Sequence, residues 1–237
     1  MLATAFTSNI APAASTDSSA ARRRVGMGSL AQSVAAGPVR TFEAKEHIFR
    51  DGDSASHVYK VEVGHVCIYK LMSDGRRQVI DFAYPGDLIG LGALKEHAAN
   101  AQVTTRTRVR CLAIATLHQV VRADAQLGLK LYEAMSRELL AARDLLFTVS
   151  QRTAMERVAG FLISLSRRNE RNGDDPSEFV LPMTRNDIAD FLGLTIETVS
   201  RTFTRLRGEG LIDLAQSVLV TIVDTEALAE LAEGRCH

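Results

Sequence analysis

The sequence predicts an α+β protein in which a region of short antiparallel strands precedes a long helix and a second, mainly helical region. Three patterns carry this prediction. In residues 39–117, apolar and polar residues alternate in short runs that glycines divide. In residues 118–151, apolar residues recur at spacings of three and four, and further on two short apolar stripes of helical spacing meet at Gly193. Alternation is typical of a half-buried strand, whereas spacings of three and four mark one face of a helix. The 237 residues are enough for one or two domains.

Residues 1–38 differ in composition from the rest of the chain. They are rich in Ala, Ser and Thr, contain Asp17 as their only acidic residue, and carry consecutive arginines from Arg22 to Arg24. Such a segment buries little apolar surface, so we expect a disordered tail. The same composition also resembles an organelle transit peptide, and this alternative stays open at the level of sequence.

Residues 39–117 predict a β-roll, that is, a jelly roll or small barrel. Val61 and Val63 alternate with polar neighbours, and the alternation resumes after Gly64. Many short strands separated by turn signals favour an antiparallel sheet that is closed or doubled. The turn signals are Asp51-Gly52, Asp74-Gly75 and Pro85-Gly86-Asp87.

Residues 118–151 predict a long helix with an apolar seam. A seam of alternating three- and four-residue spacings requires a partner helix, which can belong to the same domain or to a second copy of the chain. The residues of the seam are Tyr132, Met135, Leu139, Ala142, Leu146 and Val149.

Residues 152–237 predict a mainly helical region that also contains a pair of strands. An amphipathic helix is expected from Met155 to Arg168, followed by a polar loop ending at Glu178. Beyond Gly210, the run LIDLAQSVLVTIVD indicates two strands with a turn near residues 216–217. A short helix from Thr225 to Gly234 is expected to follow.

Within that region, two helices are expected to meet at Gly193. The first apolar stripe contains Ile188, Ala189 and Leu192, and the second contains Ile196, Val199, Phe203 and Leu206. Thr184 and Thr195 precede the two stripes, and threonine oxygens accept hydrogen bonds from the free N–H groups of a first turn. The pattern is that of a helix-turn-helix, and the strand pair after it predicts a winged form.

The second of these helices carries polar side chains opposite its apolar stripe. Glu197, Ser200, Arg201 and Thr204 follow at i, i+3, i+4 and i+7, so they project from one face. In a major groove, arginine suits the two acceptors of guanine, a carboxylate suits the amino group of cytosine, and serine adapts to either.

Arginines near the end of this helix are expected to contact phosphates, Arg205 and Arg207 among them. The alternative is a helical hairpin whose exposed face happens to be polar, with an ordinary surface ion pair between Glu197 and Arg201. The predicted DNA-binding set is Glu197, Ser200, Arg201, Thr195, Thr204, Arg205 and Arg185.

The run ETVSR from Glu197 to Arg201, with LPMTRNDIADFLGLT before it, resembles the recognition element of the Crp/Fnr family of bacterial transcription regulators. The run VYKVEVGHVCIYKLMSDGRRQVIDFAYPGDLIG is similar to the cyclic-nucleotide-binding roll of that family. In the Fnr and FixK branches, E-x-x-S-R reads a palindrome of TTGAT half-sites. The Crp branch has arginine and glycine where this chain has Ile196 and Ser200, so the resemblance favours Fnr and FixK.

The resemblance implies a cytoplasmic, sequence-specific regulator that binds double-stranded DNA as a homodimer through the helix at 118–151 and works with RNA polymerase. The FixK branch activates genes of microaerobic, anaerobic or nitrogen-fixing metabolism, often without a bound cofactor. The 28 basic and 28 acidic residues leave the chain formally neutral, so any basic footprint on DNA must be local.

The resemblance also indicates where an effector would bind, and the matching residues do not suit a cyclic nucleotide. Ala99 and Asn100 stand near the place of the Arg-Ser pair that holds the phosphate, and Leu91 follows Gly90. The phosphate would therefore lack its bidentate partner. A roll that binds haem, another nucleotide or a small molecule remains the alternative.

Metal and catalytic chemistry are not expected. Cys67, Cys111 and Cys236 are far apart in the sequence, which argues against an iron–sulfur or zinc site. We expect the first two to be small buried residues and the third to be exposed. His65 and Cys67 would share a strand face, where a haem or metal contact is conceivable but a packing role is more typical. The sequence has no apolar stretch long enough to span a membrane and no catalytic motif, so we do not expect an enzyme.

Overall fold

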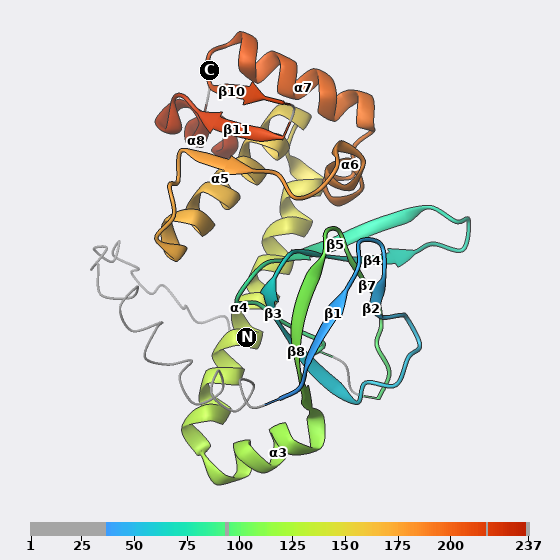
Figure 1. Cartoon of the computed structure of the whole chain (residues 1–237). Coiled ribbons are helices and arrows are strands. Elements are labelled where there is room, and N and C mark those ends of the chain that lie inside the picture. Colours follow the sequence, from blue (N-terminus) through green and yellow to red (C-terminus); the bar gives the residue numbers. More distant parts are fainter. Residues whose placement is uncertain (1–36, 93–94, 217, 236–237) are drawn as a thin grey trace, which may run out of the picture.

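The computed structural model describes residues 37–92, 95–216 and 218–235. Two four-stranded antiparallel sheets form the N-terminal β-roll (Figure 1). The strands are β1 (Val39–Phe42), β2 (His47–Phe49), β3 (His57–Val63), β4 (Val66–Leu71), β5 (Arg77–Ala83), β6 (Leu88–Ile89), β7 (Asn100–Val103) and β8 (Thr107–Ala113). One sheet has the order β1-β8-β3-β6 and the other β2-β7-β4-β5. The tail expected at residues 1–38 lies almost entirely outside the described residues.

Apolar side chains from both sheets fill the inside of the roll. Val61 on β3 and Val109 on β8 are register partners, and both are fully buried together with Val66 and Ala101 of the other sheet. The turn between β3 and β4 requires Gly64, whose φ is +87°. A Cβ at this position would lie 2.3 Å from the Thr107 hydroxyl oxygen, so a side chain there is excluded both by space and by backbone conformation.

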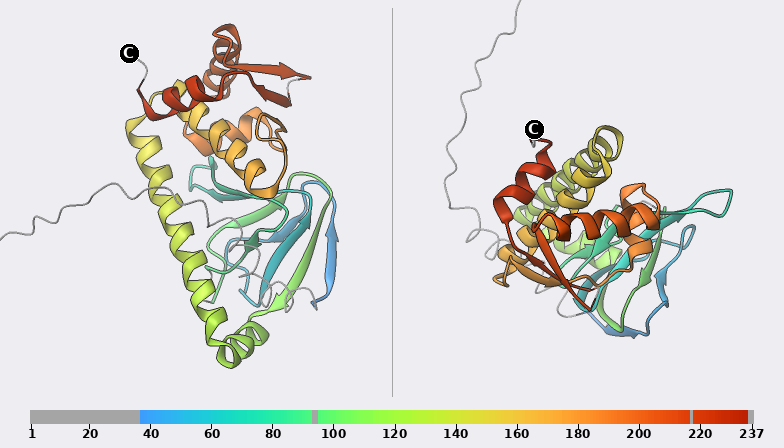
Figure 2. Two further views of the ribbon diagram at one scale, coloured as in Figure 1. Left: turned by 90° about the vertical axis from the view of Figure 1, so that its left-hand side faces the viewer. Right: turned by 90° about the horizontal axis from the view of Figure 1, so that it is seen from above.

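The region predicted as one long helix consists of two, α3 (Ile114–Ala123) and α4 (Ala125–Gln151). Asp124 separates them in an extended conformation, and its carboxylate accepts hydrogen bonds from the N–H groups of Gln126 and Leu127. It therefore begins α4 as an N-cap. Leu127 is fully buried against Leu117 of α3 and the end of the roll. From there α4 runs along the roll to the C-terminal region (Figure 2).

The C-terminal region contains α5 (Ala154–Asn172), β9 (Glu178–Val180), α6 (Arg185–Leu192), α7 (Ile196–Gly208), β10 (Ile212–Ala215), β11 (Leu219–Ile222) and α8 (Thr225–Glu233). Two predictions were wrong here. The helix α5 continues past Arg168 to a left-handed cap at Gly173, because the polar residues 167–172 remain on its exposed or half-buried turns. Glu178, expected in a loop, begins β9, which pairs with β11 and makes the wing three-stranded.

The roll and the C-terminal region share a buried cluster. Phe82 of β5 packs against Phe161 of α5 and Phe191 of α6, with its ring centroid 6.5 and 5.4 Å from theirs, and those two rings also contact each other at 5.9 Å. Such tilted pairs are favourable beyond the area they bury. In the part of the chain that the structure describes, no helix is both long and apolar enough to cross a membrane.

Candidate nucleic-acid interface

The two helices of the helix-turn-helix begin and end where local chemistry requires it. Thr184 caps α6: its hydroxyl oxygen accepts from the N–H of Asp187, and the Asp187 carboxylate accepts from the N–H of Thr184. This reciprocal capping box satisfies two donors that a helix start leaves free. Gly193 ends α6 with φ +64°. Arg157, from α5, donates to the carbonyl oxygen of Leu192 at 3.0 Å.

The helix α7 is held by one fully buried face. Val199, Phe203 and Leu206 are no more than 2% exposed, and Thr195 caps the first turn by accepting from the N–H of Thr198. The prediction that Ile196 belongs to this stripe was wrong, because its side chain lies in the first turn outside the buried cluster and is 41% exposed. Burial of the other three fixes the rotation of α7 and therefore decides which side chains point outward.

The outward face carries the four polar residues expected there. Glu197, Ser200, Arg201 and Thr204 are all exposed, and the Thr204 hydroxyl donates to the carbonyl oxygen of Ser200 at 3.1 Å. The pKa of Glu197 is lowered, mainly because its carboxylate accepts a hydrogen bond from the backbone N–H of the same residue. The Thr195 hydroxyl and the charge of Arg201 lower it further. The carboxylate is ionised near neutral pH and therefore acts only as an acceptor.

The other predicted DNA-binding residues of this segment differ in the contacts they already make. Thr195 is engaged in capping, and its hydroxyl also lies 3.0 Å from that of Thr198. Arg205, in the last turn of α7, donates to Glu209, the residue that follows the helix, at 2.8 Å, and both side chains are exposed. A surface pair of this kind is weak and can be exchanged for a phosphate. Arg207 is exposed near the end of the helix.

Arg185 does not lie on the outward face of α7. It is the first residue of α6, and its guanidinium carbon stands 3.6 Å from the centroid of the Phe203 ring. Burial lowers its pKa. The structure thus places Arg185 over the junction of the two helices, where its guanidinium covers one face of the buried Phe203 ring.

Sequence reasoning missed Arg157, which satisfies the last turn of α6, and Arg77, which contacts Asp187 and Asp190 of the same helix from the β-roll. Nothing local signals either residue, because their partners lie 35 or more positions away in the sequence.

The cysteines of the roll pack as small apolar residues, as predicted. Cys67 and Cys111 are buried free thiols, and burial raises the pKa of Cys67 to about 12. Cys236 lies outside the described residues. His65 precedes β4 and packs edge-on against Tyr84, with burial lowering its pKa. Across the described ranges, no three His, Cys, Asp or Glu residues are grouped as a metal site would require.

The buried Asn100 is engaged with the fold itself. Its side-chain amide donates to the carbonyl oxygen of Tyr69 at 3.4 Å, and its side-chain oxygen accepts from the N–H of Asp51 at 3.3 Å. It therefore links β7 to β4 and to the turn at Asp51-Gly52.

Comparison with known proteins addresses both regions of the chain. Residues 156–231 match the Crp-like helix-turn-helix domain, and residues 39–123 match the cyclic nucleotide-binding domain. The nitrogen fixation regulation protein FixK of Azorhizobium caulinodans is 40% identical over 85% of this chain and 82% of its own length. The chain belongs to the Crp/Fnr family.

Further Crp/Fnr relatives extend the match. The fumarate and nitrate reduction regulatory protein of Escherichia coli is 33% identical over 78% of this chain and 74% of its own. The structure of FixK2 from Bradyrhizobium japonicum superposes with a TM-score of 0.78 at 35% identity, covering 83% of this chain and 97% of that one. The helices α6 and α7 are therefore the DNA-binding element of a Crp/Fnr transcription regulator.

Proposed function

We propose that this Crp/Fnr protein is a transcription activator that reads a TTGAT palindrome as a homodimer and controls genes of anaerobic, microaerobic or nitrogen-fixing metabolism. The observation that carries the proposal is the outward face of α7, where Glu197, Ser200 and Arg201 are exposed while the opposite face is buried. The relatives named FixK, together with the transcriptional activator Anr of Pseudomonas aeruginosa at 35% identity, support the physiological part.

The three side chains have the chemistry that a TTGAT half-site requires. Arg201 would donate to N7 and O6 of the guanine, which is the most common specific contact in a major groove. Glu197, ionised and an acceptor only, would receive the amino group of the cytosine on the complementary strand. Ser200 lies between them on the helix and can donate to or accept from the neighbouring base.

The proposed dimer would form through α4. Tyr132 and Leu146 are each 72% exposed and Leu139 is 53% exposed, although the seam they form is apolar. An apolar helix stripe that its own chain leaves uncovered favours a second helix as partner, and two-fold symmetry matches a palindrome. Activation would also require a contact with RNA polymerase, and a protein that acts on bacterial DNA in this way works in the cytoplasm.

Fluorescence anisotropy would test the readout. The purified protein, in air and without added ligand, is titrated against a TTGAT palindrome and against a copy in which both guanines are replaced. We expect a loss of about 1–3 kcal/mol per half-site on the second duplex. Weak and equal binding to both, with strong salt dependence, would reveal only non-specific phosphate contacts and would contradict the proposal.

A further inference from the structure

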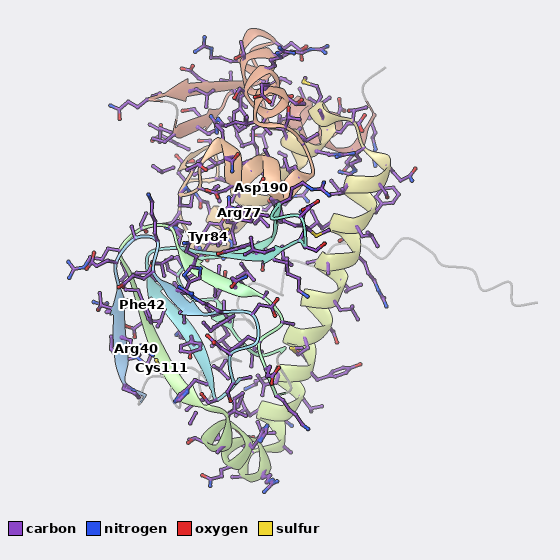
Figure 3. All side chains as sticks on the ribbon, turned by 90° about the vertical axis from the view of Figure 1, so that its right-hand side faces the viewer. Arg40, Phe42, Arg77, Tyr84, Cys111 and Asp190 are labelled. Carbon is purple, nitrogen blue, oxygen red and sulfur yellow. The ribbon has the colours of Figure 1, made fainter. Side chains whose placement is uncertain are left out.

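The β-roll makes a direct ionic contact with the first helix of the helix-turn-helix. Arg77 begins β5 next to the turn of the β4–β5 hairpin, opposite Leu71, and reaches α6, where its guanidinium contacts both Asp187 and Asp190. Its Nε lies 2.9 Å and its Nη2 2.8 Å from Oδ2 of Asp190. Figure 3 shows Arg77 and Asp190 side by side at the junction of the two regions. One fork-shaped cation therefore bridges two carboxylates that stand one turn apart.

The contact is partly shielded from water. The side chains of Arg77, Asp187 and Asp190 are 24%, 12% and 23% exposed. Burial alone would raise the pKa of Asp187, but the hydrogen bonds from Thr184 and Arg77 outweigh it and the pKa is lowered. Shielded ion pairs are geometrically demanding, and removing one partner leaves an uncompensated charge.

Neighbouring contacts fix the guanidinium in place. The Tyr69 ring lies against it, with its centroid 5.4 Å from the guanidinium carbon, and the Tyr69 hydroxyl is 2.9 Å from Nε2 of His47. Gln78, the next residue of β5, donates to the backbone carbonyl of Asp190. The arginine is thus held from the roll side, while its two acceptors belong to α6.

Movement of α6 implies movement of α7. Ile188 and Leu192 of α6 share one buried cluster with Val199 and Phe203 of α7, so the two helices form a single packed unit. The outward face of α7 remains exposed while α6 is docked. A second interdomain ion pair, Arg168 with Asp87 at 2.8 Å, joins the roll to α5 and not to these helices.

We propose that Arg77 is a positioning residue for DNA binding: by bridging Asp187 and Asp190 it fixes the helix-turn-helix on the β-roll in the orientation that a palindrome requires. A dimer that reads two half-sites must hold its two recognition helices about 34–36 Å apart. In a dimer joined through α4, this separation depends on how each helix-turn-helix is anchored to the rest of its own subunit. The inference rests on the proposed palindrome and dimer.

The test compares neighbouring arginines of the same hairpin. Arg77→Met removes the bridge, whereas Arg76→Met removes an equal charge from a side chain that is 77% exposed and pairs with Asp74. We expect Arg77→Met to bind the TTGAT palindrome about ten-fold more weakly than wild type, and Arg76→Met to stay within about two-fold. Asp190→Asn should weaken binding as well, and the double variant Arg77→Met/Asp190→Asn should be no weaker than Arg77→Met alone.

Half-site spacing separates positioning from stability. The wild type should disfavour duplexes whose half-sites are moved apart or together by one base pair, and Arg77→Met should lose much of this preference while still discriminating against a replaced guanine. The slope of log affinity against log salt should stay unchanged, since a lost phosphate contact would reduce it by about 1. Thermal unfolding and the dimeric state are measured on the same samples.

Should Arg77→Met fail to fold, Arg77→Lys keeps the charge but lacks the fork, and it should show the same loss of spacing preference to a smaller degree. Wild-type affinity and spacing preference in the folded Arg77 variants would overturn the proposal, and so would tighter binding. If the wild type binds equally well with and without the guanines, the proposed function is contradicted. If the wild type does read the guanines but the Arg77 variants bind as the wild type does, only the positioning role is contradicted.

Discussion

At the scale of single residues, Arg201 is the side chain whose removal is most informative. We expect Arg201→Ala to lose about 1–3 kcal/mol of binding free energy on the TTGAT palindrome and to relax the preference for guanine, because the bidentate donor is gone. Anisotropy titrations on duplexes with guanine or adenine at that position measure both effects. A variant that still distinguishes the two bases would contradict the assignment.

The control is Arg207→Ala on the same helix. Arg207 is exposed and is expected to contact phosphate, so its removal should weaken binding to all duplexes equally and reduce the salt dependence. The two arginines differ in which face of α7 they occupy, and burial of Val199, Phe203 and Leu206 decides that difference.

A second residue-scale prediction concerns Cys67. Burial raises the pKa of its thiol to about 12, so the thiol stays protonated and unreactive near neutral pH. In a Cys236→Ser variant, Ellman's reagent at pH 8 should titrate no thiol rapidly in the folded protein, and both remaining thiols after denaturation. Rapid reaction of one or both thiols in the native state would show that the roll opens at β4 or β8 more easily than its packing implies.

At the scale of elements, the capping box of α6 should contribute measurably to stability. Thr184→Ala removes the acceptor for the N–H of Asp187 and is expected to lower the free energy of unfolding by about 0.5–2 kcal/mol. Urea unfolding followed by circular dichroism measures the change. Thr225→Ala serves as the control, because Thr225 is an exposed first residue of α8 and the cap there is Asp224. Equal losses in both variants would contradict a specific capping effect.

The same helix start predicts a dependence on pH. The pKa of Asp187 is lowered in the fold, so its ionic contribution is fully present above the ordinary carboxyl pKa of about 3.9 and is lost as pH falls below it. The difference in unfolding free energy between wild type and Asp187→Asn should therefore shrink as pH falls from 7 to about 3. The exposed Glu230 supplies the control variant Glu230→Gln, and a constant difference for Asp187→Asn would contradict the linkage.

Elements defined by neighbouring residues could be predicted from the sequence, and elements defined by distant partners could not. Thr184, Asp187 and Gly193 fix the limits of α6 within a few positions, so the helix-turn-helix was expected at the right place. The strand β9 forms because it pairs with β11 about 40 residues later. It has only three residues, too few to show the alternation of apolar and polar residues that predicts a strand. Arg77 lies 110 residues before Asp187, which placed the roll–helix contact beyond any local pattern.

At the scale of the whole molecule, the exposed seam of α4 predicts the oligomeric state. Leu139→Lys places a charge in the seam, where Leu139 is 53% exposed in the single chain but would be buried against a second helix. We expect the variant to be monomeric at micromolar concentration in sedimentation velocity. Its affinity for the palindrome should fall by more than about ten-fold, because two half-sites can then no longer be bound by one preformed unit.

Ala141→Lys is the matched control, since it adds the same charge to an exposed position of α4 outside the seam. It should leave both the dimer and DNA binding intact. Dissociation in both variants would indicate that any added charge disrupts α4, and a dimeric Leu139→Lys would move the contact between subunits elsewhere. Because the proposed dimer contact lies on α4 and Arg77 contacts α6, the two properties should separate experimentally. We expect Leu139→Lys to abolish the dimer, and Arg77→Met to leave a dimer with poorly positioned recognition helices.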